Sequence, residues 1–166
     1  MPGFSINVPS AAVSGWEMTL VLDNLRSAHN VGNIFRIAEA LGAAEIIACG
    51  YTPAPPHPRL EKTAMGSDKM VPCRCFASSL EAVKVLRQEG VKEILAAEPL
   101  PGSVPAWKRE YNFPLAVIFG NEALGVHPET LEVVDGLVSL PMHGEKASIN
   151  VGNAAAAILY AIESKE

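Results

Sequence analysis

The chain has 166 residues, of which 49% are hydrophobic and 19% charged, so it can bury one substantial core and is not disordered. No apolar run reaches the ~18 residues of a membrane span, and the first residues lack the basic and apolar regions of a signal peptide. A net charge of −5 argues against a protein that coats nucleic acid without specificity. We therefore expect a single soluble domain in the cytoplasm.

The three cysteines, Cys49, Cys73 and Cys75, are expected to be free thiols. An odd number of cysteines in a chain of this length is typical of a reducing compartment, not of a disulfide framework. Cys73 and Cys75 have no further cysteine or histidine partners at ligand spacing, so we expect no metal ion.

The predicted elements begin at residue 18, after an irregular N-terminal arm at residues 1–17. Short apolar runs predict strands, and helical spacing of apolar residues predicts helices. Strands are expected at residues 18–22, 45–49, 71–76, 93–97, 115–119 and 137–140. Helices are expected to end at Gly42 and Gly90, to cover residues 128–134 and to begin near residue 150. A proline-rich loop at 52–58 precedes a short helix or turn, and residues 99–112 form another loop.

Strands and helices alternate along the chain, and the central strands are apolar throughout. This pattern predicts an α/β domain at residues 18–166, with a mainly parallel sheet and helices on both faces. The last helix, Val151 to Ile162, carries almost no charge and is apolar nearly all round, so we expect it to be buried on every side.

The segment from residue 57 to residue 75 is a basic island in an acidic chain. Its charged residues are Arg59, Lys62, Lys69 and Arg74 against Glu61 and Asp68. Such an island is either an ordinary solvated surface or a patch that helps to bind nucleic acid.

Unusual polar residues follow the first predicted strand, and in open α/β sheets the working loops leave the carboxyl ends of strands. They are His29, Asn30, Asn33 and Arg36. Asn30 can cap the following helix, and Asn33 and Arg36 are near neighbours on one helical face. Arg36 could hold a phosphate with its fork of donors. The alternative is a capping asparagine and a surface arginine.

Two further loops carry candidate chemistry. The loop Gly120-Asn121-Glu122-Ala123-Leu124-Gly125 has two glycines that let backbone approach a ligand, and a carboxylate between them. It matches neither a Walker loop nor GxGxxG, and a tight turn is the alternative. In the Ser148-Ile149-Asn150 turn, Ser148 has no His–Asp pair placed to activate it. A capping or ligand-binding hydroxyl is therefore favoured over a nucleophile.

Three segments in this order, NVGNIFRIAEALGA, LAVIFGNEALGV and LPMHGEKASINVGNAAAAILYAI, resemble the three motifs of the SPOUT methyltransferases. The closer likeness is to the TrmH-type branch, which methylates the ribose 2′-hydroxyl of tRNA or rRNA. It extends from about Met18 to Ile162, and PPHPRLEKTAMGSDKMV also looks like members of this branch. Departures are small: Ile149 stands where leucine is usual, and Gly152-Asn153 where small residues or serine are expected.

The resemblance implies a fold, a cofactor and an assembly. Members have an α/β sheet whose C-terminal segment forms a deep trefoil knot, bind S-adenosylmethionine in that knot and form homodimers. Matched motif to motif, the likeness implies catalytic roles for Arg36, Asn30, Glu122, Ser148 and Asn150. It places the cofactor against Gly120, Asn121, Leu140, Met142, Ser148 and Ile149.

We therefore predict an S-adenosylmethionine-dependent RNA 2′-O-ribose methyltransferase. Its RNA is expected to contact Arg36 and the basic island, Arg59, Lys62, Lys69 and Arg74. The family proposal makes Arg36 the base, but a guanidinium stays protonated in proteins, so a clamp on a phosphate and a developing alkoxide fits the chemistry better. The alternatives are a non-catalytic cofactor- or RNA-binding module on the same fold, and a plain nucleotide-binding domain. The lack of a glycine-rich phosphate loop argues against the latter.

Overall fold

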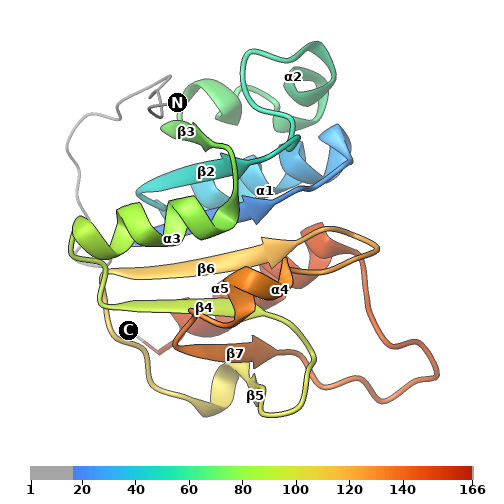
Figure 1. Ribbon diagram of the computed structural model, residues 1–166. Coiled ribbons are helices and arrows are strands. Elements are labelled where there is room, and N and C mark those ends of the chain that lie inside the picture. Colours follow the sequence, from blue (N-terminus) through green and yellow to red (C-terminus); the bar gives the residue numbers. More distant parts are fainter. Residues whose placement is uncertain (1–16, 166) are drawn as a thin grey trace.

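The computed structural model describes residues 17–165, so the predicted arm at residues 1–17 lies outside the described residues except for its last residue. Within them the backbone forms one sheet of seven parallel strands in the order β3-β2-β1-β6-β4-β7-β5 (Figure 1). The strands are β1 Met18–Asp23, β2 Glu45–Cys49, β3 Cys73–Phe76, β4 Glu93–Ala97, β5 Val104–Pro105, β6 Leu115–Gly120 and β7 Gly136–Ser139. The predicted α/β class with a parallel sheet is confirmed.

Helices cover both faces of the sheet, which explains why its central strands are apolar throughout. Every residue of β1 and β6 is buried. Leu20 and Leu22 of β1 pack with the helices of one face, and Val21 packs with those of the other. The first face carries α1 Ala28–Leu41, α2 Pro58–Ala64 and α5 Val151–Glu163, and the second carries α3 Ser79–Gln88 and α4 Pro128–Leu131 (Figure 1). Two 3₁₀ turns, η1 Ser67–Lys69 and η2 Ala106–Lys108, complete the described elements.

Helix α1 is capped by Ser27 and not by Asn30, which the sequence allowed as a cap. The Ser27 hydroxyl accepts a hydrogen bond from the N–H of Asn30 at 3.1 Å, and the helix ends at Gly42 with φ 68° as predicted. Serine is as good an N-cap as asparagine and stands one residue before the first helical position. The side chain of Asn30 is therefore available for contacts with other loops.

Helix α5 is buried on one side only, which corrects the prediction of burial on every side. Leu159 and Ile162 are fully buried against the core, whereas Asn153, Ala157 and Tyr160 are exposed, Tyr160 to 48%. Small apolar residues surround the whole helix, but within the described residues one chain covers only the side that faces α1 and the sheet. The exposed side remains available to another molecule.

The remaining sequence predictions are resolved only in part. The loop predicted at 99–112 contains β5 and η2, because Val104 and Pro105 pair with the edge of β7. No helix among residues 17–165 is long and apolar enough to cross a membrane. The cysteines are free thiols. The trefoil knot that the resemblance implies stays a prediction.

Candidate functional site

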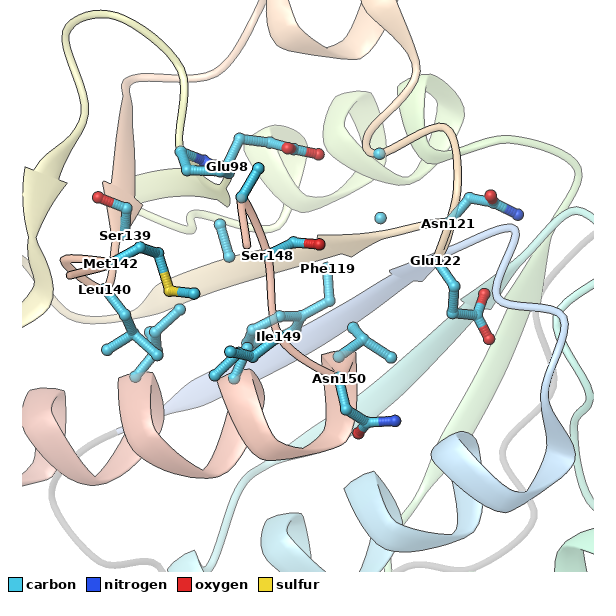
Figure 2. A pocket seen from close by; sticks show the side chains of 18 of the residues that line it. Glu98, Phe119, Asn121, Glu122, Ser139, Leu140, Met142, Ser148, Ile149 and Asn150 are labelled. Carbon is cyan, nitrogen blue, oxygen red and sulfur yellow. The ribbon is translucent and has the colours of Figure 1, made fainter. Parts of the chain in front are cut away.

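A cavity of about 660 Å³ opens at the carboxyl edge of the sheet, where the predicted loops meet (Figure 2). Its walls come from the ends of β4, β6 and β7, the segment 140–150 and the first turns of α5. Nine predicted site residues line it: Asn30, Gly120, Asn121, Glu122, Leu140, Met142, Ser148, Ile149 and Asn150. Three segments far apart in the sequence therefore build one pocket.

A line of hydrogen bonds joins these three segments. Asn30 Nδ2 donates to Glu122 Oε2 at 3.2 Å, and Asn30 Oδ1 accepts from Asn150 Nδ2 at 3.0 Å. Asn150 Oδ1 in turn accepts from the N–H groups of Gly152 and Asn153 and so caps α5. We call Glu122, Asn30 and Asn150 the relay, because each fixes the position of the next.

The Glu122 carboxylate is held by donors and is ionised. Arg26 N–H donates to Oε1 at 2.9 Å and Ser27 N–H to Oε2 at 3.0 Å, at the start of α1. Partial burial raises the pKa of this carboxyl, but these amides and Asn30 outweigh it and bring the pKa below its ordinary value. A carboxylate whose lone pairs are taken up in this way is a support for α1, and a poor general base.

Gly120 and Asn121 build the turn between β6 and Glu122. A Cβ atom on Gly120 would lie 2.2 Å from the carbonyl carbon of Gly125, so only glycine fits where the turn closes on itself. Asn121 Oδ1 accepts from the N–H groups of Ala123 and Leu124, and its Nδ2 donates to the backbone oxygen of Asn24. The Asn121 side chain thus holds the loop, and its hydrogen bonds are made within the protein.

The charge of the pocket is negative. Among the described residues that line it, Glu98 and Glu122 are the charged ones, and no lysine or arginine is present. Burial raises the pKa of the Glu98 carboxyl, the nearby Asp23 raises it further, and the N–H of Val126 lowers it. The pocket therefore lacks the cations that the phosphates of NAD or ATP would require. It can accept a ligand that carries a positive charge.

S-adenosylmethionine fits this lining. Pockets of ~300–1,000 Å³ with apolar walls and a few polar groups are typical of small-molecule sites. Here Phe119, Leu140, Met142 and Ile149 supply apolar contact area, and Ser139 and Ser148 supply hydroxyls around it (Figure 2). A sulfonium and an ammonium group would meet an environment with two carboxylates. The alternative of a phosphate-binding nucleotide domain loses its support at this point.

Arg36 does not line the pocket of its own chain. It lies on the exposed side of α1, six residues after Asn30, and its guanidinium makes no hydrogen bond or ion pair with another described residue. Arg59, Lys62 and Lys69, on α2 and η1, are likewise exposed and unpaired among the residues that the structure describes. Helix α2 packs directly against α1, where Gly32 meets the side chain of Thr63. These four cations are thus presented from α1, α2 and the 3₁₀ turn η1.

Arg74, the remaining predicted RNA contact, is placed differently. Its guanidinium bridges Glu45 Oε1 at 2.5 Å and Glu89 Oε2 at 2.8 Å, and its side chain is only 20% exposed. Both carboxylates lie near the amino edge of the sheet, away from the pocket. The sequence shows Arg74 as part of a basic island, but its charge is neutralised by residues 29 positions before and 15 after it.

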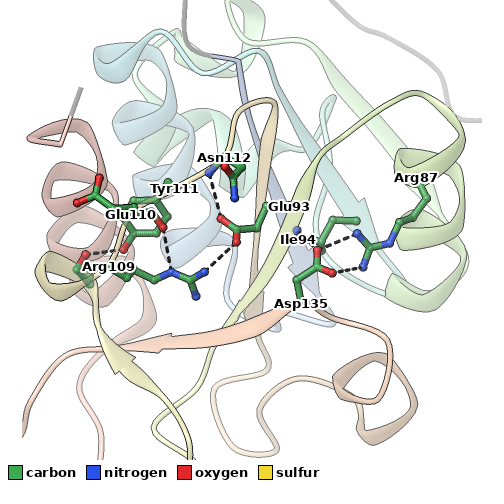
Figure 3. A network of polar contacts seen from close by, with 9 residues as sticks. Arg87, Glu93, Ile94, Arg109, Glu110, Tyr111, Asn112 and Asp135 are labelled. Atoms are coloured by element: carbon green, nitrogen blue, oxygen red, sulfur yellow. Dashed lines mark hydrogen bonds and ion pairs between the residues drawn. The ribbon is translucent and has the colours of Figure 1, made fainter.

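Other cations at the amino edge are paired as well (Figure 3). Arg109 contacts Glu93 at 2.8 Å, and Arg87 contacts Asp135 at 2.8 Å, on either side of the start of β4. Asp135 also accepts from the N–H of Ile94 at 2.7 Å. The two pairs hold the loop before β6 and the start of β7 against β4, and their role is structural.

Two polar residues that line the pocket were missed from the sequence. Glu98 and Ser139 line the pocket at the carboxyl ends of β4 and β7. Glu98 directly follows the predicted strand 93–97, so its place at the working edge of the sheet was the available signal. Ser148 lines the pocket as predicted and makes no hydrogen bond with another described residue, which leaves its hydroxyl available to a ligand.

The domain has an acidic pocket at the carboxyl edge of its parallel sheet and, among the described residues, unpaired cations on α1, α2 and η1. These charges suit a class of protein that binds a cationic small molecule and a polyanion. Comparison with known proteins shows the family to which the chain belongs. Residues 17–160 match the model of the SpoU rRNA Methylase family, and the chain belongs to this family.

Individual relatives agree with the family assignment. A tRNA (guanosine(18)-2′-O)-methyltransferase of Thermus thermophilus is 33% identical over 87% of this chain and 73% of its own length. A 23S rRNA (guanosine-2′-O-)-methyltransferase, RlmB, of Ralstonia nicotianae is 30% identical over 89% of this chain and 59% of its own. The crystal structure of an AdoMet-bound rRNA methyltransferase from Sinorhizobium meliloti superposes with a TM-score of 0.82 at 30% identity. That match covers 89% of this chain and 56% of the other, so the chain spans little more than half of two of these three relatives.

Proposed function

We propose that the domain transfers a methyl group from S-adenosylmethionine to a ribose 2′-hydroxyl of tRNA or rRNA. The observation that carries this proposal is the relay, which joins the three motif segments of a SpoU-family chain around one acidic pocket. The matched relatives are described as ribose 2′-O-methyltransferases of tRNA and rRNA. Membership in the family and the negative charge of the pocket both favour S-adenosylmethionine as the cofactor.

When bound, S-adenosylmethionine supplies an electrophilic methyl group on a sulfonium centre. The new bond forms between the 2′-oxygen and the methyl carbon, the carbon–sulfur bond breaks, and the hydroxyl proton leaves to solvent or a base. The task of the protein is to align the 2′-oxygen with that methyl and to stabilise charge that develops on the oxygen.

We assign Arg36 to the RNA and not to proton transfer. A guanidinium remains protonated, so Arg36 can bind the phosphate next to the target ribose and stabilise a developing alkoxide. Arg59, Lys62 and Lys69 extend this positive surface along α2 and η1. Arg74 contributes little to it, because two carboxylates already neutralise its charge.

We further propose that the domain works as a homodimer in the cytoplasm. The exposed side of α5, with Asn153, Ala157 and Tyr160, carries no charge before Glu163 at the end of the helix and offers close approach to a second copy. We propose that in this dimer Arg36 of one copy serves the pocket of the other, since Arg36 does not line the pocket of its own chain. Light scattering of wild type and of Tyr160→Glu tests it: a wild-type monomer would contradict the assembly.

Methyl transfer itself is tested with radiolabelled S-adenosylmethionine and separate pools of unmodified tRNA and rRNA. Wild type is expected to label one pool at a linkage that resists alkali, and Arg36→Ala to lose turnover while it keeps cofactor affinity. Lys84→Ala is the matched control, because Lys84 is an exposed cation on α3 at the opposite face. Cofactor binding without transfer to either pool would instead favour a non-catalytic module.

A further inference from the structure

Tyr51 is an exposed aromatic residue at the working edge of the sheet. It follows β2 after one residue, Gly50, and 59% of the residue is accessible to solvent. In the sheet order β2 lies beside β1 and β1 beside β6, so Tyr51 lies on the α2 side of the loop that carries Glu122. A single exposed tyrosine is ordinary, and its position and attachments are what require an explanation.

Tyr51 is held by hydrogen bonds at both its backbone and its hydroxyl. Its backbone N–H donates to Asn24 Oδ1 at 3.1 Å, and its hydroxyl accepts from Asn121 Nδ2 at 2.9 Å. Asn24 and Gly50 both have left-handed backbone conformations, with φ 55° and 62°, which fold the β2 loop onto the β1 loop. A Cβ atom on Gly50 would lie 1.8 Å from Asn24 Oδ1, so the contact is close. The ring is therefore held in place with much of its surface in solvent.

The surroundings of Tyr51 combine apolar surface with positive charge. Leu124, which is 84% exposed, donates its N–H to the same Asn121 amide that holds the tyrosine hydroxyl. Arg26 is exposed in the loop that Glu122 holds, and the chain beyond Tyr51 leads into α2 with its unpaired cations. Stacking surfaces flanked by cations are the arrangement with which proteins bind unpaired nucleotides.

A structural explanation for Tyr51 would be that its hydroxyl merely supports Asn121. That role explains the hydrogen bond but not the exposed ring, because Asn121 is already held by Asn24 and by two amides of its own loop. A ring that is held in place with its face in solvent is suited to contact with a ligand that has an aromatic face of its own.

We propose that the ring of Tyr51 stacks on an unpaired base of the RNA and so positions the target strand across the Glu122 loop toward the pocket. This inference rests on the proposed function, because it names the part of the RNA that the site recognises. The target nucleotide then lies in a loop or other single-stranded segment, since a base inside a duplex presents no face to the ring.

The experiment compares Tyr51→Leu and Tyr51→Phe with wild type on the tRNA and rRNA transcripts. KM for RNA, kcat, RNA affinity by fluorescence anisotropy and S-adenosylmethionine affinity by calorimetry are measured for each. Removing one base–aromatic stack should weaken RNA binding about tenfold. Tyr51→Leu should therefore raise KM and the RNA dissociation constant about tenfold and leave cofactor affinity unchanged, whereas Tyr51→Phe stays close to wild type. Trp107→Leu is the matched control, because Trp107 is 46% exposed and lies beside β5 at the other end of the sheet.

The possible outcomes separate the two claims. Unchanged RNA binding in Tyr51→Leu overturns the stacking proposal. Equal losses in Tyr51→Leu and Tyr51→Phe also overturn it, because they would assign the effect to the hydroxyl and Asn121. If wild type binds RNA but transfers no methyl group, the proposed function fails, and the anisotropy comparison still decides the role of Tyr51. If wild type binds neither transcript, both claims fail.

Discussion

Replacing Asn30 with alanine breaks the relay at its centre. The change removes two side-chain hydrogen bonds, one to Glu122 at 3.2 Å and one from Asn150 at 3.0 Å. A hydrogen bond contributes ~0.5–1.5 kcal/mol net, and more when one partner is charged. Glu122 keeps the amide donors of Arg26 and Ser27, so the fold should persist. We expect the free energy of unfolding to fall by about 1–3 kcal/mol.

Urea denaturation measures this loss, and Asn33→Ala provides the matched control. Asn33 lies one turn further along α1, is half-buried and makes no side-chain hydrogen bond to a described residue. Both variants gain the same helix propensity, so the difference between their midpoints isolates the relay. Asn30→Ala should also bind S-adenosylmethionine more weakly, because Asn150 lines the pocket. Equal midpoints for the two variants would refute the reasoning.

Asn30→Asp adds a test by pH. It places a second carboxylate against Glu122, whose own pKa already lies below its ordinary value. Repulsion raises the folded-state pKa of the introduced carboxyl above its unfolded value, so the destabilisation is full at neutral pH and is relieved as the pH falls through the raised pKa. The stability gap to Asn30→Ala should therefore narrow as the pH falls from neutrality. A constant gap would contradict the contact with Glu122.

Three further changes probe the turn, the charge of the pocket and the opposite edge. Gly120→Ala should lower the free energy of unfolding, measured by urea denaturation, by more than about 2 kcal/mol, because the new Cβ would lie 2.2 Å from the backbone of Gly125. Gly144→Ala should leave the free energy of unfolding unchanged, because a Cβ there would have no described atom within 4 Å. If Glu98 attracts a cationic ligand, the affinity for S-adenosylmethionine, measured by calorimetry, should fall as the pH drops through the raised pKa of Glu98. Glu98→Gln should remove that pH dependence. The same pH profile in both proteins would show that the Glu98 carboxylate does not attract the ligand. Glu93→Ala leaves Arg109 unpaired and should cost about 3 kcal/mol of stability without a change in cofactor affinity. A weaker cofactor affinity in this variant would mean that the two edges are coupled.

Most of the fold was predictable because its signals are local. The apolar runs at 45–49 and 93–97 match β2 and β4 residue for residue. The two-residue strand β5 could not be found, because Val104-Pro105 has no pattern of its own and pairs only where β7 passes. Burial of α5 was overestimated for a related reason. An apolar composition shows that the surface of a helix can be buried, but it does not say whether the same chain or another molecule buries it.

The site was predictable in its membership but not in its connections. Asn30, Glu122 and Asn150 were identified from motif order, yet no sequence rule states that the Asn30 amide bridges the other two across 92 and 120 positions. Arg74 shows the reverse case. Local counting of charges placed it with Arg59, and only the tertiary structure reveals the carboxylates that neutralise it.

The distribution of charge around the site explains how an acidic chain can use RNA as a substrate. The net charge of −5 disfavours nonspecific binding to a polyanion. The cations Arg87, Arg109 and Arg74 are paired with carboxylates near the amino edge, so they add little to the field at the opposite edge. Arg36 and the cations of α2 and η1 remain unpaired among the described residues, whereas the pocket is lined by the two carboxylates Glu98 and Glu122. Under the proposed function, the unpaired cations would attract an RNA strand and the acidic pocket would repel its phosphates, which favours occupation of the pocket by the cationic cofactor.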